Sequence, residues 1–153
     1  MFNKKKTELI AFPQKSKHIK YVVPETVKKI AGKAFYHNKQ VQEIVLPEGL
    51  KRINPETFYG CLQLSRISIP GQVASIGKYA FYHCNSLKEV VLSSTITQIG
   101  YSAFAKLFIG KDEIGVYAVT NVNGFTEKCQ AGSFAEQYAK EQKMKIEYIK
   151  DFL

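Results

Sequence analysis

The sequence predicts one α/β solenoid in which short strands from successive repeats form a β-sheet along one face. Its 153 residues are enough for one domain with a core of its own, and few for two. A pair that ends in phenylalanine recurs every 23 residues, at Ala34-Phe35, Thr57-Phe58, Ala80-Phe81 and Ala103-Phe104. An isoleucine recurs at the same interval, at Ile30, Ile53, Ile76 and Ile99. One such unit cannot bury its own apolar side, so the units are expected to stack.

Each repeat is expected to begin with a short strand. The segment Ile44-Val45-Leu46 aligns with Ile67-Ser68-Ile69 and Val90-Val91-Leu92, and most of its residues are β-branched. Proline or serine follows each segment, and proline cannot donate a hydrogen bond to a sheet. The strand should therefore end there.

Side chains alternate between the two sides of a strand, which assigns each column of the repeat to a side. Two columns are uniformly apolar and should face the core: Tyr21, Ile44, Ile67 and Val90, and Val23, Leu46, Ile69 and Leu92. Two columns should face outward: Lys20, Glu43, Arg66 and Glu89, and Val22, Val45, Ser68 and Val91. We expect this outward face to be the partner-binding surface, because solenoids commonly bind there. Plain cross-strand ion pairing is the alternative explanation of its charges.

The second half of each repeat should return the chain to the next strand. A turn is expected at Gly77 and Gly100, where the other units have Ala31 and Asn54. The Ala-Phe pair should then start a helical turn whose phenylalanine fills the core. Each central unit closes with a cysteine followed by a leucine, at Cys61 and Leu64 and at Cys84 and Leu87.

The unit from Leu64 to Leu87, LSRISIPGQVASIGKYAFYHCNSL, resembles the BspA-type leucine-rich repeat. The opening Thr7–Pro13 is similar to the first strand of that family, and the close is similar to its terminal helix (Gly132–Lys140) and final strand (Lys145–Ile149). The units depart from the pattern at three places: Asn38 and Leu107 replace the cysteine, and Asn54-Pro55 follows Ile53. The resemblance implies a leucine-rich-repeat solenoid.

We predict one leucine-rich-repeat domain over residues 1–153. Residues 1–17 form an opening strand and N-terminal cap, residues 18–110 form four repeats, and residues 111–153 form a degenerate repeat and a helix–strand cap. The repeat register is lost after Leu107, and a strand is expected around Val116–Val119. Terminal repeats are expected to be atypical because they cover an open end of the core.

The resemblance also implies function and location. Such proteins are typically secreted or surface-exposed in bacteria and some parasitic protists, and are associated with adhesion. We therefore expect a non-catalytic protein-binding module whose partner is a host matrix or cell-surface protein; self-association is a further possibility. The apolar run Leu9–Phe12 is too short for a signal peptide, which needs roughly 7–15 apolar residues. No run approaches the roughly 18 apolar residues of a membrane span, so no membrane insertion is expected.

The alternative partner is a polyanion, either a glycosaminoglycan or, less favoured, a nucleic acid. The net charge is +9, and residues 1–60 carry 12 Lys and Arg against 5 Asp and Glu. The cluster that could bind a polyanion comprises Lys28, Lys29, Lys33, Lys51 and Arg52. A neighbouring column of Tyr36, Tyr59 and Tyr82 could stack on bases, although packing at the edge of the solenoid is the more common role of tyrosines beside core phenylalanines.

The residues of catalytic and metal sites are sparse. Cys61 and Cys84 stand in a column that should face the core, where cysteine behaves as a small apolar residue; a disulfide between them and a metal site are the alternatives. His37 and His83 share one column with Gly60, which should be exposed. No glycine-rich phosphate loop occurs. We therefore expect no enzyme activity, catalytic residue, cofactor or metal ion.

Overall fold

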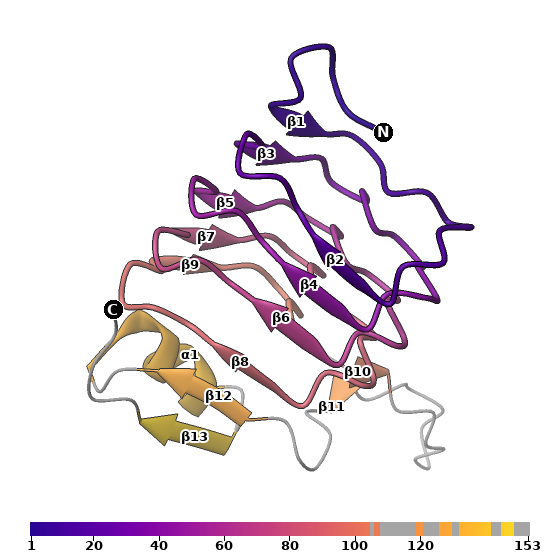
Figure 1. Ribbon diagram of the computed structural model, residues 1–153. Helices are drawn as coiled ribbons and strands as arrows, with labels where there is room; N and C mark the ends of the chain where they lie inside the picture. Colours follow the sequence, from indigo (N-terminus) through magenta and orange to yellow (C-terminus); the bar gives the residue numbers. More distant parts are fainter. Residues whose placement is uncertain (105, 108–118, 121–125, 130–131, 142–144, 149–153) are drawn as a thin grey trace.

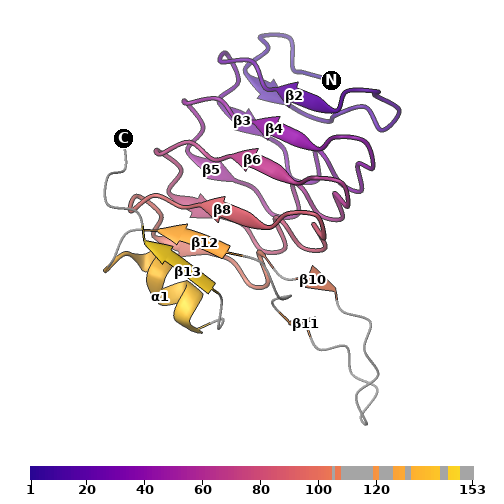
Figure 2. The same cartoon turned by 60° about the horizontal axis from the view of Figure 1, so that its bottom comes forward.

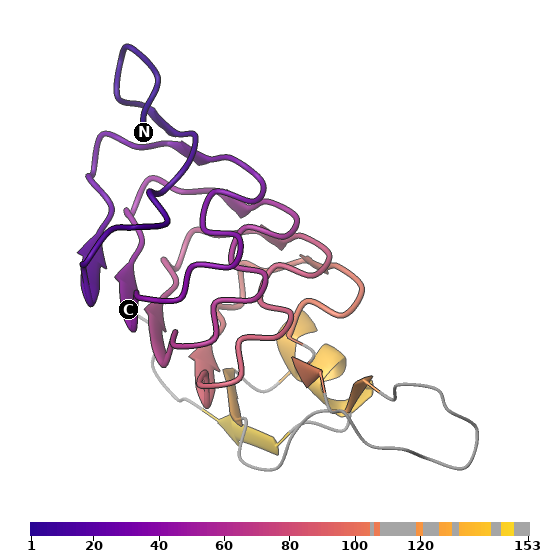
Figure 3. The same ribbon diagram turned by 90° about the vertical axis from the view of Figure 1, so that its right-hand side faces the viewer.

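The computed structural model describes residues 1–104, 106–107, 119–120, 126–129, 132–141 and 145–148. The chain winds into a solenoid whose successive coils stack in parallel layers (Figures 1 and 3). Short strands form two rows along the solenoid, one from the start of each repeat and one from its middle (Figure 1). This architecture confirms the predicted leucine-rich-repeat solenoid.

The first row contains the strands that the sequence predicts. Strands β2 (Lys20–Val22), β4 (Glu43–Val45) and β6 (Arg66–Ser68) form a parallel sheet in which residues of the same repeat position pair. Strand β8 (Glu89–Val91) lies beside β6 and pairs with β12 (Thr126–Cys129), which pairs with β13 (Lys145–Tyr148) (Figure 2). The row therefore consists of two three-stranded sheets, β2-β4-β6 and β8-β12-β13.

The second row was not predicted. It contains five two-residue strands: β1 (Glu8–Leu9), β3 (Lys29–Ile30), β5 (Arg52–Ile53), β7 (Ser75–Ile76) and β9 (Gln98–Ile99). They pair in parallel as β1-β3 and β5-β7-β9. The expected turn follows the isoleucine of each unit as predicted, for example with the Ala80 amide donating to the Gly77 carbonyl (3.2 Å). Two residues are too short to display the alternation by which a strand is recognised in sequence. The opening strand was expected within Thr7–Pro13, and β1 confirms it.

A ladder of phenylalanine rings runs through the core. Neighbouring rings lie 4.9 Å apart at Phe12 and Phe35 and 5.1 Å apart at each later step through Phe58, Phe81 and Phe104. All five side chains are buried. Columns of Ile, Val and Leu surround them, so the stacked core predicted from the repeat is confirmed.

The expected helical turn at each Ala-Phe pair does not form. The chain makes consecutive hydrogen-bonded turns instead, for example from the Ala34 amide to the Ala31 carbonyl (3.1 Å) and from the Asn38 amide to the Phe35 carbonyl (2.9 Å). Residues with a left-handed backbone conformation (positive φ) flank the phenylalanine on both sides. The position two residues before it is occupied by Lys33, Glu56, Tyr79 and Ser102, and the position two residues after it by His37, Gly60 and His83. A left-handed residue cannot continue a right-handed helix, which explains the difference.

The C-terminal end is covered by helix α1 (Phe134–Glu141), as the resemblance implied. Ser133 Oγ accepts the Glu136 amide (3.1 Å) and the Glu136 carboxylate accepts the Gly132 amide (2.5 Å), which fixes the start of the helix. Ala135 and Ala139 are buried. The predicted final strand, Lys145–Ile149, is confirmed by β13 over Lys145–Tyr148.

The degenerate repeat differs from the expectation. Of the strand predicted at Val116–Val119, residues 116–118 lie outside the described residues, and Val119 begins β11 (Val119–Thr120), antiparallel to β10 (Lys106–Leu107). The strand that continues the first row is β12, which the sequence analysis missed. Its sequence, Thr-Glu-Lys-Cys, lacks the apolar columns that mark the other strands of this row.

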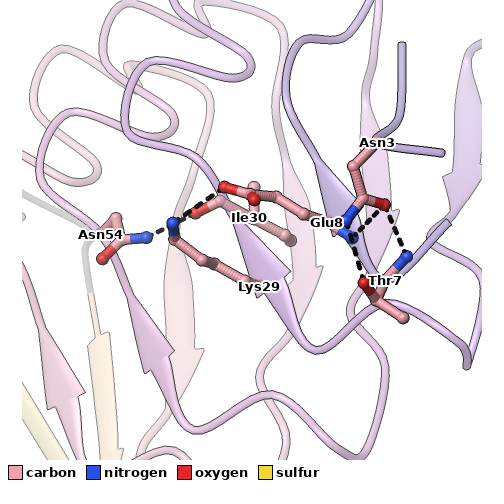
Figure 4. Close-up of polar contacts among 6 residues, drawn as sticks. All are labelled: Asn3, Thr7, Glu8, Lys29, Ile30 and Asn54. Atoms are coloured by element: carbon pink, nitrogen blue, oxygen red, sulfur yellow. Dashed lines mark hydrogen bonds and ion pairs between the residues drawn. The ribbon is translucent and has the colours of Figure 1, made fainter. Parts of the chain in front are cut away.

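The N-terminal end is closed by a short hairpin that Asn3 holds together (Figure 4). Asn3 Oδ1 accepts the amides of Thr7 (2.9 Å) and Glu8 (3.1 Å), and Asn3 Nδ2 donates to Thr7 Oγ1 (3.0 Å). Glu8 then pairs with Lys29 across the second row (2.9 Å). The hairpin therefore ties β1 to the first complete repeat.

Candidate functional site

The outward face of β2, β4, β6 and β8, called here the first-strand face, carries the side chains that the sequence analysis singled out. Lys20, Glu43 and Arg66 pair across the strands in one column, and Val22, Val45 and Ser68 in the next. Val22 is 56% exposed and Val91 is 38% exposed. The backbone of Glu89 belongs to β8, and its side chain lies outside the described residues. The predicted outward orientation is confirmed for the other side chains of the two columns.

A chain of ion pairs crosses this face. The Glu43 carboxylate forms an ion pair with Lys20 Nζ (2.7 Å) on one side and with Arg66 Nη2 (3.2 Å) on the other. The hydrogen bond from Lys20 and the positive charges of Lys20 and Arg66 hold the pKa of the Glu43 carboxyl below its usual range. Cross-strand pairing thus accounts for part of the charge pattern. The Arg66 side chain nevertheless stays 78% exposed, so most of its donors face solvent.

A groove opens on the first-strand face where its two sheets adjoin. Its volume is about 250 Å³. Its lining comes from β4, β6 and β8 and the residue before β6: Glu43, Ile44, Val45, Ser65, Arg66, Ile67, Ser68, Val90 and Val91. The apolar residues Val45 and Val91 therefore line the groove together with Arg66. Five of the eight predicted residues, namely Glu43, Val45, Arg66, Ser68 and Val91, line this groove.

The predicted basic cluster lies mostly on and around the second row of strands and is partly neutralised. Lys29 pairs with Glu8 at 2.9 Å, and Lys33 pairs with Glu56 at 3.5 Å. Lys28 Nζ donates to the carbonyl of Glu25 (3.5 Å), and Lys51 Nζ donates to Gln72 Oε1. Arg52 is exposed and lines a second hollow of about 330 Å³ over β5, β7 and β9. The carboxylates that face Lys29 and Lys33 weaken the field that a polyanion would experience.

The tyrosine column forms a second ladder outside the phenylalanine ladder. Tyr36 and Tyr59 stack at 5.0 Å, and Tyr59 and Tyr82 stack at 5.1 Å. All three side chains are half-buried, and burial raises the pKa of Tyr59 and Tyr82. Because the rings stack on one another, their faces are occupied within the ladder. This favours edge packing over the stacking on bases that the polyanion alternative would use.

The cysteine column lies in the core, whereas the histidine column lies nearer the surface. Cys61 Sγ donates to the Phe35 carbonyl (3.0 Å) and Cys84 Sγ to the Phe58 carbonyl (3.1 Å), so both are buried thiols and the disulfide alternative is wrong. His37 is exposed and His83 is half-buried; burial, followed by the charge of His37, lowers the pKa of His83. Among the described residues, no group of three or more metal-ligating side chains gathers.

Comparison with family models places these columns in a known class. The model described as a BspA type leucine rich repeat region matches residues 5–129 in six copies. The chain belongs to the BspA-type leucine-rich-repeat family. The resemblance seen in the sequence is therefore confirmed, and the two rows of strands are the local form of this family's repeat.

Solved structures show the same fold. The pneumococcal vaccine antigen PcpA has a TM-score of 0.62 and 20% identity, covering 98% of this chain and 46% of that one. The Treponema (T. pallidum) leucine-rich-repeat protein TpLRR has a TM-score of 0.50 and 28% identity, covering 58% and 55%. A leucine-rich cell surface protein from Faecalibacterium prausnitzii has 0.50 and 19%, covering 68% and 39%. This BspA-type chain thus spans about half or less of the length of these proteins.

A search of curated protein sequences finds no significant match to this BspA-type chain. Within the part of the chain that the structure describes, no helix is long and apolar enough to cross a membrane. The groove itself was not predicted, although five of its nine lining residues were. Its lining comes from three adjacent strands, β4, β6 and β8, so no single repeat unit predicts it.

Proposed function

We propose that this chain is a non-catalytic protein-binding module with an adhesion role at the bacterial cell surface, and that it binds through the first-strand face. The groove over β4, β6 and β8 supports the proposal most, because it combines apolar walls with an exposed guanidinium. Two solved relatives are described as a vaccine antigen and as a cell surface protein, which favours the same location here.

The chemistry of the groove favours one kind of partner. An aliphatic or aromatic side chain would pack between Val45 and Val91, and a carboxylate beside it would pair with Arg66. Arginine forms planar, bidentate pairs with carboxylates and is enriched where interfaces concentrate binding energy. The partner we propose is therefore a host matrix or cell-surface protein that presents an apolar residue next to an acidic one.

The decisive experiment measures binding of the purified chain to a panel of host matrix proteins in 0.15 M and 0.5 M NaCl. The test variant is Arg66→Glu, and the matched control is Arg52→Glu, which reverses an exposed arginine on the second row. We expect Arg66→Glu to weaken binding about tenfold or more, the cost of a broken charge pair, and Arg52→Glu to leave it unchanged. Binding in 0.5 M salt should persist because the groove is partly apolar.

The polyanion alternative makes the opposite prediction. If the second-row basic residues were the site, heparin would bind, 0.5 M salt would abolish the binding, and Arg52→Glu would weaken it while Arg66→Glu would not. That pattern, or equal losses for both variants, would contradict the proposal for the first-strand face.

A further inference from the structure

The outer edge of β2 is an unpaired sheet edge at the N-terminal end of the first row. Strand β2 stands at the end of its sheet, and no strand of the described residues pairs with its outer side. On the inner side, the carbonyl of Ile19 accepts the amides of Gln42 (2.7 Å) and Glu43 (3.1 Å), and the amide of Val23 donates to Val45 (2.9 Å). Backbone groups alternate in direction along a strand, so the N–H and C=O groups of Lys20 and Val22 point outward.

Two exposed apolar side chains flank these outward groups. Ile19 is 61% exposed and Val22 is 56% exposed. At the repeat position of Ile19, the later units carry only polar residues: Gln42, Ser65 and Lys88. An exposed isoleucine beside the unpaired edge of β2 is the side chain that an added strand would cover.

The charges around this edge favour a partner of negative charge. In the column that contains Lys20, the residues alternate in charge from strand to strand, as Lys20, Glu43, Arg66 and Glu89. If the alternation continued outward, the residue opposite Lys20 on an added strand would be acidic. Lys15 and Lys17, just before β2, are also exposed. Like charges directly opposite each other destabilise a sheet, and opposite charges stabilise it.

We propose that the outer edge of β2 binds an extended acidic–apolar peptide segment of a partner protein, which adds a parallel strand to the first row. The backbone groups of Lys20 and Val22 supply the hydrogen bonds, a carboxylate of the peptide pairs with Lys20, and its apolar residues cover Ile19 and Val22. This site is separate from the groove and goes beyond the proposed function. A lysine on a short edge strand also discourages neutral strands from pairing, which makes the edge selective.

A second copy of this chain fits the edge poorly. The opposite end of the first row is β13, and the pairing of β8, β12 and β13 places Lys145 in the column of Glu89 and Thr126. Stacking β13 of one copy on β2 of another in the same register would therefore place Lys145 beside Lys20. Two lysines in one cross-strand pair repel each other, which disfavours this assembly.

The test uses a synthetic peptide with the sequence of residues 41–48, VQEIVLPE, as the probe, because the first of its two glutamates, Glu43, pairs with Lys20 on the inner side of β2. A fluorophore-labelled version is titrated with the full chain and followed by anisotropy. A peptide with lysine in place of that glutamate is the control. We expect the acidic peptide to bind about tenfold more tightly than the lysine peptide, the equivalent of one ion pair with its hydrogen bond. Hydrogen exchange of the Lys20 and Val22 amides should slow on binding.

Variants of β2 separate an added strand from other modes of binding. Val22→Pro removes an outward N–H and spares the inner bonds, so it should weaken binding about tenfold; Val22→Thr keeps the N–H and should bind nearly normally. Circular dichroism establishes that both fold. Should Val22→Pro fail to fold, Lys20→Glu replaces it, and this variant must prefer the lysine peptide over the acidic one.

The remaining outcomes overturn the proposal. Equal binding of the two peptides, or normal binding by Val22→Pro, would exclude an added strand. If heparin displaced the peptide and bound the Val22→Pro variant as tightly as the unchanged chain, the lysines would be a polyanion site. If sedimentation showed a dimer that Val22→Pro abolished, the edge would bind a second copy of the chain. Arg66→Glu should leave peptide binding intact, so a failure here is distinguishable from a failure of the groove.

Discussion

The first repeat and the two central repeats share one backbone path but fill it differently. In the central repeats, the thiols of Cys61 and Cys84 each donate to a phenylalanine carbonyl of the preceding coil. At the same position of the first repeat stands Asn38, whose Oδ1 accepts the amides of Gln40 (3.0 Å) and Val41 (2.9 Å) while its Nδ2 has no hydrogen-bond partner. The Asn38 side chain thus accepts hydrogen bonds from its own loop, whereas the two thiols donate to the coil before theirs.

This difference shows that the consensus residues suit a repeat that has another coil on each side. Central positions must match two neighbours, whereas the first repeat has a hairpin on one side. The same contrast appears on the surface, where Ile19 replaces the polar residues of later units. Departures from the consensus therefore mark where stacking changes or a surface becomes available.

The largest test of this comparison removes rings from the phenylalanine ladder. Phe58→Ala should lower the free energy of unfolding by about 3–5 kcal/mol, because the fully buried ring stacks on Phe35 and Phe81 and leaves a cavity. Phe12→Ala, at the end of the ladder, should cost clearly less. Urea denaturation followed by circular dichroism measures both. Equal losses would show that the end coil packs as tightly as the central ones.

The next test concerns the left-handed position that Gly60 shares with His37 and His83. Gly60 has a φ of +70°, and a methyl group added there would overlap the imidazole of His37. Gly60→Ala should therefore lower the free energy of unfolding by about 2–3 kcal/mol, combining left-handed strain with a steric clash.

The matched control is the double variant His37→Ala/Gly60→Ala, compared with His37→Ala alone. Removing the imidazole should recover the steric part and leave about 1–2 kcal/mol of left-handed strain. If the double variant were no more stable than Gly60→Ala, contact between these two coils would not be the cause.

The features that repeat in register were predictable from sequence. The columns of β2, β4, β6 and β8 and the phenylalanine ladder follow from residue type and spacing alone. The left-handed turns were missed because Lys33, Tyr79 and His83 occupy positions that usually signal themselves by glycine or asparagine. The strand β12 was missed because its residues pair through the backbone without the apolar columns.

The candidate site was predictable in composition but not in shape. Alternation identified Val45, Arg66 and Val91 as outward residues, and the structure places all three in one groove. The groove spans three neighbouring coils, so its shape cannot be predicted from one repeat. The open edge at β2 likewise depends on the N-terminal hairpin pairing β1 with β3 in the second row and not with β2.

A smaller effect is expected at the cysteine column. Cys61→Ala and Cys84→Ala should each lower the free energy of unfolding by about 1 kcal/mol, because each loses one weak hydrogen bond and a small buried volume. The two losses should be similar, since both sites are central. Site-resolved mass spectrometry after thiol labelling should show both cysteines protected in the native chain. Rapid labelling of either thiol would contradict its burial.

The smallest effect is a pH dependence at Glu43. Its pKa is lowered in the folded chain, so its contribution to stability is complete above the unfolded pKa of about 4.3 and is lost as the pH falls through the folded value. Glu43→Gln should therefore lower the melting temperature by about 1–3 °C at pH 7, a surface-pair effect, and by less at pH 3. Glu8→Gln is the matched control, because Glu8 at the N-terminal end pairs with Lys29 whereas Glu43 pairs with two cations. A larger loss for Glu8→Gln, or an undiminished loss for Glu43→Gln at pH 3, would show that the ion pairs of the first-strand face do not stabilise the central coils.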